Sequence, residues 1–194
     1  MSIDQSIIAF IHQYHSAGMD RFMWWISYRD ASFLLYLVMI FVLLRRFQLS
    51  VWKVLICFGL LILFNDQLAS TIFKPMVERL RPSHDPILEG YLHFVKDNNG
   101  HDYKGGQFGF YSSHAANTMA VALFFILVLR PIHRFWTIFL TIWVLLIGYS
   151  RMYLGVHYLT DVLMGWLMGG FSAWGLWKGL KSKKMQHWLN LSLH

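Results

Sequence analysis

Long apolar segments are the feature of this sequence that most limits its fold. The segments 33–44, 51–64 and 135–149 contain a single charged residue, Lys53. A helix needs about 20 mainly apolar residues to cross a hydrocarbon core that is roughly 30 Å thick. With the residues that adjoin these segments, the sequence predicts an all-α, polytopic bundle of about five transmembrane helices.

The polar residues between the apolar segments set the expected limits of each span. We predict spans at about 30–46, 51–73, 114–130, 134–149 and 157–178. Residues 1–29 are too polar to span but carry aromatic and apolar residues at helical spacing, which predicts an interfacial amphipathic helical segment. The segment 75–113 is long for a structureless connection, so we expect it to form an outward-facing lid or substrate-recognition loop.

Composition supports a membrane protein with a single domain over residues 1–194. Of the 194 residues, 56% are hydrophobic and only 14% are charged, whereas soluble domains carry about 25% charged residues. No Pro-, Gly- or Ser-rich linker divides the chain. The lone Cys57 lies in an apolar segment, so no disulfide within the chain is expected. We identify no secretory signal peptide, because the first twenty residues lack a basic region and include Asp4 and Asp20.

The charges separate between the two sides of the predicted bundle. One side has only basic residues: Arg45, Arg46, Lys53, Arg130, Arg134, Lys178, Lys181, Lys183 and Lys184. All ten carboxylates belong to the other side or its adjoining helix ends. The positive-inside rule therefore places the basic side in the cytoplasm and the other side outward. This separation favours a membrane protein over a nucleic-acid partner as the explanation of the net charge of +7.

Three segments deliver chemically capable side chains to the predicted outer side. They are 74–82 after the second span, 111–114 before the third span, and 150–161 between the last two spans. Together they supply Lys74, Arg81, Ser112, Ser113, His114, Arg151, His157 and Asp161. The three cations can surround a phosphate, while the serines and the amides at a helix N-terminus add donors. Such donors can stabilise a five-coordinate phosphorus without a metal or another cofactor.

The two histidines divide the remaining chemistry. His157 and Asp161 are four residues apart, so on a helix the carboxylate would hold one imidazole nitrogen and leave the other free. We therefore predict that His157 is the nucleophile. His114 would protonate the leaving group and then deprotonate the water that hydrolyses the phosphohistidine.

These motifs resemble those of the type 2 phosphatidic acid phosphatase (PAP2) family of membrane lipid phosphatases, shared with vanadium haloperoxidases and glucose-6-phosphatase. The matching pattern is Lys-x6-Arg-Pro, x-Ser-x-His and Ser-Arg-x5-His-x3-Asp, from Lys74 to Asp161. The resemblance implies a helical transmembrane core, no metal, and phosphate binding by Lys74, Arg81, Ser112, Ser113 and Arg151. It also implies acid–base work by His114, nucleophilic attack by His157 and support from Asp161. Tyr111 and Ser113 replace the proline and glycine usual in the second motif.

The resemblance leaves several substrates open: a polyprenyl diphosphate such as undecaprenyl diphosphate, phosphatidate or phosphatidylglycerol phosphate, and a lipid A phosphate. The segment 110–117 resembles the lipid A phosphatase branch. We expect a bacterial inner-membrane protein whose partners are its lipid substrate and membrane lipids, with no obligatory protein partner. A vanadate-dependent peroxidase and a non-enzymatic lipid transporter or channel are the alternatives.

Three polar features have a second interpretation. His84, His93 and His101 could form a metal site in the segment 75–113, but no ligand spacing supports one and a solvated loop is favoured. Asn65 and its neighbours in the second span could support Lys74 or join helices, and we favour the latter. Gly165 and Gly169 predict close helix packing in the fifth span.

Overall fold

The chain folds as a helical bundle in the computed structural model, which describes residues 1–129 and 134–182 apart from the side chains of residues 29–31 and 49. The α-helices are α1 (Ile3–Gln13), α2 (Ala17–Ser27), α3 (Arg29–Phe47), α4 (Val51–Gln67), α5 (Lys74–Val77), α6 (Ser113–Val128), α7 (Arg134–Tyr153) and α8 (Leu159–Leu180). A π-helical segment, Leu68–Phe73, joins α4 to α5. The described residues contain no strand, which confirms the all-α prediction.

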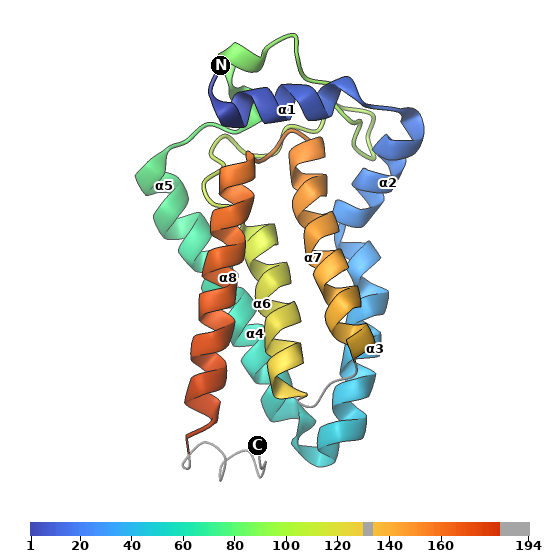
Figure 1. Ribbon diagram of the computed structural model, residues 1–194, viewed down its shortest axis with the longest axis vertical. Helices are drawn as coiled ribbons and strands as arrows, with labels where there is room; N and C mark the ends of the chain where they lie inside the picture. Colours follow the sequence, from blue (N-terminus) through green and yellow to red (C-terminus); the bar gives the residue numbers. More distant parts are fainter. Residues whose placement is uncertain (130–133, 183–194) are drawn as a thin grey trace.

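Five long helices run along the bundle and α1 lies across one end of it (Figure 1). The central helix α6 is mostly buried, and its Phe124 and Phe125 are fully enclosed. The outer faces instead expose large apolar side chains, such as Phe41 on α3, Phe135 on α7 and Phe171 on α8. An apolar exterior of this extent suits contact with lipid rather than with water.

Two described helices are long and apolar enough to cross a membrane, namely Val51–Val77 and Arg134–Tyr153. The bent pair Ala17–Ser27 and Ser32–Phe47 would make a third, while Ser113–Val128 is a shorter apolar helix. The predicted count of about five spans therefore stays a prediction. The predicted end of the third span, Arg130, lies outside the described residues, as do Lys183 and Lys184.

The predicted boundaries are wrong around the last two helices. The helix α7 continues to Tyr153, so Arg151 lies in its last turn rather than in a connecting loop. It ends where Gly155 adopts a positive φ of 67°, a conformation that glycine takes without steric cost. His157 precedes α8, whose N-cap is Tyr158, so His157 and Asp161 do not share a helix.

The two glycines of α8 let α6 approach closely, as predicted. An ideal Cβ at Gly165 would lie 2.6 Å from the carbonyl oxygen of Ser112, and one at Gly169 would lie 2.1 Å from that of Ala116. Asn65 of α4 also joins α8, because its Nδ2 donates to Ser172 Oγ at 2.9 Å. The backbone that begins α6 therefore rests directly on α8.

Replacing Gly169 with alanine is expected to destabilise the bundle. The new methyl group would meet backbone atoms of α6, and overpacking of this kind costs about 1–3 kcal/mol. Thermal unfolding of the purified protein should show a lower Tm for Gly169→Ala. The adjacent Gly170 has no atom within 4 Å of an ideal Cβ, so Gly170→Ala is the matched control and should leave Tm unchanged. Equal Tm values for the two variants would contradict the close packing.

The N-terminal segment is helical, as predicted, and forms α1 and α2, of which α1 packs against protein. Ile8 and Ile11 are buried against the end of the bundle. His12 is also buried, and its ring nitrogens contact the carbonyl oxygens of His93 at 3.0 Å and Met152 at 3.2 Å. The helix α1 thus covers the end of the bundle that carries the three motifs (Figure 1).

The segment 75–113 is folded rather than structureless. It contains short 3-10 helices at Pro82–His84 and Pro86–Leu88, and isolated bridges pair Leu80 with Phe108 and Lys96 with Asp102. This fold positions the residues around Arg81. Movement of the segment as a lid stays a prediction.

Candidate active site

The structure brings the three predicted motifs together at the end of the bundle covered by α1 (Figure 1). Lys74 begins α5, and its Nζ lies 3.4 Å from Ser70 Oγ. His114 and Arg151 line one pocket, and the charges of Lys74, Arg81 and Arg151 all act on His157. The motifs that are distant in sequence therefore form one cationic site.

Backbone contacts fix the motifs to one another. Ser112 caps α6 by accepting a hydrogen bond from the Ala115 N–H, and its own N–H donates to the Asp161 carbonyl oxygen at 3.1 Å. An ideal Cβ at Gly109 would lie 3.2 Å from both Arg81 Cγ and Asp161 Oδ2, and 3.6 Å from His157 Nδ1. A side chain at position 109 would therefore press against Arg81 and Asp161.

Arg81 is buried and held by the folded segment 75–113. Its Nε donates to the carbonyl oxygen of Phe108 at 3.1 Å. Burial lowers the pKa of Arg81, and the neighbouring charge of Arg151 lowers it further. Gly105 has a φ of 66°, and an ideal Cβ there would lie 2.5 Å from Arg81 Nη1. Gly105 thus allows the guanidinium of Arg81 to approach the backbone closely.

Arg151 is 3% exposed, and two residues outside the motifs hold it. Its Nη1 donates to Ser27 Oγ at the end of α2, and its Nη2 donates to Tyr103 Oη at 3.3 Å. Its buried Nε has no hydrogen-bond partner among the described residues. That N–H is available for a bound anion.

His157 is 1% exposed and lies between charged neighbours. Burial lowers its pKa well below the usual value of 6.5, and the positive charges of Arg151, Arg81 and Lys74 lower it further. The imidazole is therefore neutral at pH 7, which is the state that a nucleophilic histidine requires.

The predicted hydrogen bond from Asp161 to His157 is absent. Asp161 Oδ2 lies 3.6 Å from His157 Nδ1, which is beyond hydrogen-bonding range. The same Oδ2 accepts the Tyr158 N–H at 2.9 Å, as part of the capping box of α8. Asp161 Oδ1 accepts from Arg79 Nη1 at 2.8 Å. The carboxylate acts on His157 electrostatically, while its hydrogen bonds go to Tyr158 and Arg79.

Several residues around the site escaped prediction. Arg79 lies inside the first motif, but sequence gives no sign that it pairs with Asp161 and with Asp4 of α1. Ser27 and Tyr103, the partners of Arg151, likewise come from segments without a motif. These contacts join residues far apart in the chain, and neither helical periodicity nor motif spacing encodes them.

The second motif departs from the family pattern without disturbing the helix that follows. Tyr111 is fully buried, and its ring lies edge-on to Phe73 with 5.2 Å between centroids. Ser113 is buried, and its neighbour His114 is exposed toward the cavities that follow.

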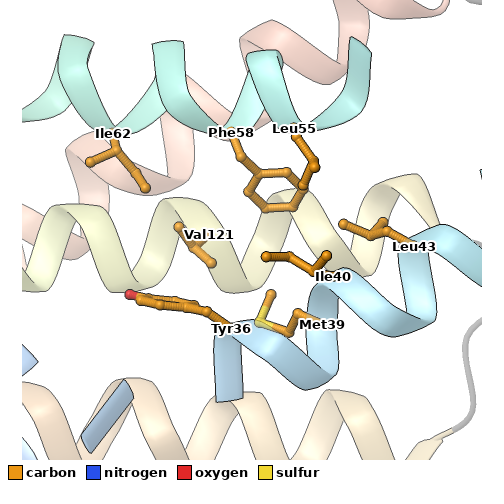
Figure 2. A pocket seen from close by; sticks show the side chains of 8 residues that line it. All are labelled: Tyr36, Met39, Ile40, Leu43, Leu55, Phe58, Ile62 and Val121. Atoms are coloured by element: carbon orange, nitrogen blue, oxygen red, sulfur yellow. The ribbon is translucent and has the colours of Figure 1, made fainter. Parts of the chain in front are cut away.

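Three adjoining cavities lead away from the site. A pocket of about 240 Å³ contains His114 and Arg151, and a cavity of about 720 Å³ extends from His114 between α3, α4 and α6. Tyr36 and Ile62 also line an apolar pocket of about 130 Å³, in which α3, α4 and α6 contribute side chains (Figure 2). The site is thus polar at Arg151 and becomes apolar toward the middle of the bundle.

The segment 75–113 shows no metal centre. Across residues 1–129 and 134–182, no group of three or more His, Cys, Asp or Glu side chains is placed to hold a metal ion. His101 is exposed, as expected for a solvated loop, whereas His93 contacts Asp20 Oδ2 at 2.9 Å and stacks on His15.

Comparison with known families identifies the family of this chain. The PAP2 superfamily matches residues 51–184, which include all three motifs. The chain belongs to the PAP2 superfamily. The PAP2 match begins after α3, so the residues of α1 and α2 that contact the site lie outside it.

Curated PAP2 relatives are phosphatases. The chain is 36% identical over 178 residues to the lipid A 4'-phosphatase of Bacteroides thetaiotaomicron, covering 89% of this chain and 74% of that protein. It is 42% identical over 108 residues to the lipid A 4'-phosphatase of Porphyromonas gingivalis, of which it spans only 43%. It is 30% identical to phosphatidylglycerophosphatase B of Bacillus subtilis, covering 72% of this chain and 64% of that protein.

Solved PAP2 structures share the fold. A transmembrane PAP2 phosphatidylglycerolphosphate phosphatase from Bacillus subtilis superposes with a TM-score of 0.64 at 22% identity, covering 92% of this chain and 84% of the other. Aquifex aeolicus LpxE superposes with a TM-score of 0.65 at 20% identity, covering 92% and 96%. The chain is a membrane enzyme of the PAP2 phosphatase type, which confirms the phosphatase prediction over the transporter and peroxidase alternatives.

Proposed function

We propose that this enzyme removes a phosphate from a lipid A-type glycolipid at the outward face of the bacterial inner membrane. The observation that supports this most directly is the continuity between the cationic site and the apolar cavity. A lipid whose phosphate lies at Arg151 and His114 can place its acyl chains in the pocket between α3 and α4 (Figure 2). The 36% identity to a lipid A 4'-phosphatase supports the choice of headgroup.

In the proposed mechanism, Lys74, Arg81 and Arg151 hold the phosphate together with the N–H groups that begin α6. His157 Nε2 attacks phosphorus, because Nδ1 is the nitrogen that faces Asp161. The P–O bond to the sugar breaks, and His114 donates its proton to the departing oxygen.

The second step releases inorganic phosphate. His114, now without its proton, takes one from a water molecule that attacks the phosphohistidine. The N–P bond breaks, and its electron pair returns to His157. Each step passes through five-coordinate phosphorus, whose additional negative charge the three cations would stabilise. The cycle ends with both histidines in their starting states and needs no metal.

The outward orientation rests on charge. Arg45, Arg46 and Lys178 lie at helix ends opposite the motifs, at the end away from α1 (Figure 1). Acidic residues gather at the other end, where Asp4 and Asp161 contact Arg79. The positive-inside rule then assigns the site to the outer side of the inner membrane. We further propose that the chain is a single phosphatase domain in which the folded segment 75–113 recognises the headgroup.

A substrate panel tests this proposal. Purified enzyme in detergent with a chelator would be given a lipid A bisphosphate, phosphatidylglycerol phosphate and undecaprenyl diphosphate, and released phosphate would be measured. We expect the highest kcat/KM on lipid A, with mass spectrometry showing loss of one phosphate from the sugar. Preference for phosphatidylglycerol phosphate or undecaprenyl diphosphate would overturn the headgroup assignment. Absence of phosphate release from all three would overturn the proposed function.

A further inference from the structure

The N-terminal helix α1 reaches the active site, although it lies outside the PAP2 match. Asp4 Oδ2 accepts a hydrogen bond from Arg79 Nη2 at 2.7 Å, and Asp4 Oδ1 accepts the Thr160 N–H at 3.3 Å. The Asp4 side chain is only 11% exposed. Burial alone would raise the pKa of Asp4, but hydrogen bonds from Arg79 and Thr160 lower this pKa overall. The group is therefore a carboxylate at neutral pH. A negative charge is therefore held beside the start of α8, where a helix favours it.

Arg79 connects this carboxylate to the site. Its Nη1 donates to Asp161 Oδ1 at 2.8 Å and to Thr160 Oγ1 at 2.6 Å, while Nη2 donates to Asp4 Oδ2. The guanidinium carbon lies 4.2 Å from the centre of the Tyr158 ring, which further restricts its position. One guanidinium thus lies between two carboxylates, and the second carboxylate is the one beside His157.

A second contact from α1 fixes the residue that follows His157. Gln5 Nε2 donates to Asp85 Oδ2 at 2.8 Å, and the same oxygen accepts from Tyr158 Oη at 2.5 Å. His157 Nδ1 has no hydrogen-bond partner among the described residues. Its orientation therefore depends on the backbone and carboxylates around it, and α1 contacts both Tyr158 (through Asp85) and Thr160.

We propose that Asp4 is a positioning residue for His157, acting through Arg79 and Asp161. With Asp4 present, Arg79 shares its positive charge between two carboxylates. Asp161 then keeps more of its negative field at His157, where positive charge develops during attack on phosphorus. Without Asp4, Arg79 would pair with Asp161 and no second carboxylate, so it would offset more of the negative charge of Asp161 at His157. This inference rests on the proposed nucleophilic role of His157.

Asp4→Asn tests the proposal, because it removes the charge and keeps the size. We expect kcat to fall about 10-fold with KM within twofold of wild type, the size expected for one charge-assisted hydrogen bond in a network. Asp4→Glu should recover most of kcat. In an Arg79→Gln background, Asp4→Asn should have little further effect, because the connecting guanidinium is gone.

The matched structural control is Asp20→Asn. Asp20 also attaches the N-terminal segment to the bundle, through Tyr153 Oη at 2.6 Å and His93 Nε2, but it does not contact Arg79. This variant should lower Tm and leave kcat within about twofold, as expected for a distant site. An equal loss of kcat in Asp20→Asn and Asp4→Asn would overturn the proposal, as would an unchanged kcat in Asp4→Asn.

Vanadate binding separates this proposal from the choice of lipid. Vanadate adopts the five-coordinate geometry of the transition state, so its affinity reports the field at His157 without any lipid substrate. By calorimetry on the full-length protein, Asp4→Asn should weaken vanadate binding about 10-fold, and Asp20→Asn should not. If no lipid in the panel is hydrolysed but this difference persists, the proposed function fails while the role of Asp4 at His157 stands. Equal vanadate affinities in wild type and Asp4→Asn would overturn the role of Asp4.

Discussion

Replacing His157 with asparagine is expected to reduce phosphate release by at least about 10³-fold, as when other catalytic nucleophiles are removed. Asparagine has roughly the size of the imidazole but cannot form a covalent bond to phosphorus at the required position. His157 is 1% exposed, so its ring is held within the protein and no mobile side chain from the surface can take its place. Wild-type enzyme quenched during turnover of a labelled substrate should carry label on His157, and the variant should carry none.

His101→Asn is the matched control, because His101 is exposed in the segment 75–113. It should retain wild-type kcat. A turnover rate of His157→Asn above about one tenth of the wild-type rate would refute the covalent mechanism, because removal of the nucleophile lowers the rate much further.

The same histidine sets the acidic limit of activity. A folded-state pKa below 6.5 means that His157 stays neutral as the pH falls through 6.5, and that it loses nucleophilicity only when it is protonated at a lower pH. Burial and the charge of Arg151 are the main causes of this shift. The acidic limb of kcat/KM assigned to His157 should therefore lie below pH 6.5.

Replacing Arg151 with lysine is expected to lower kcat/KM by about 10²–10³-fold, the range found when one oxyanion donor is lost. Lysine keeps the positive charge but not the planar fork. In the structure, Ser27 and Tyr103 hold the two terminal nitrogens and Nε remains without a partner among the described residues. An ammonium group cannot satisfy both partners and also present an oriented donor to phosphate.

Arg21→Lys is the control for the same chemical change at an exposed site, where Arg21 Nε donates to the Ala17 carbonyl oxygen. It should behave as wild type in kcat/KM and in vanadate affinity. If Arg151→Lys also kept both values, the phosphate would have to be held without Arg151.

The sequence predicted which segments meet, but not how their side chains are paired. Helix ends on one side of a membrane bundle must be neighbours, so Arg81, His114 and His157 could be placed at one site from motif positions alone. The assumed contact between His157 and Asp161 failed because it required both residues to share a helix. Gly155 ends α7, and α8 begins only after His157, so the carboxylate became a helix cap.

Pairings between distant residues escaped prediction for a different reason. Asp4 and Arg79 meet because α1 folds across the end of the bundle, and no periodicity within α1 indicates that position. Nothing in the sequence indicates either that Gly105 and Gly109 lie against Arg81. Such requirements arise only from the packed structure, since they depend on which side chain fills the space beside each glycine.

The close contact between α6 and α8 has a consequence for how a lipid reaches the site. With Gly169 against the backbone of Ala116, nothing can pass between these two helices at that point unless they separate, and separating them would pull Ser112 away from Asp161. We therefore expect a lipid to reach the site through the cavity that extends from His114 between α3 and α4.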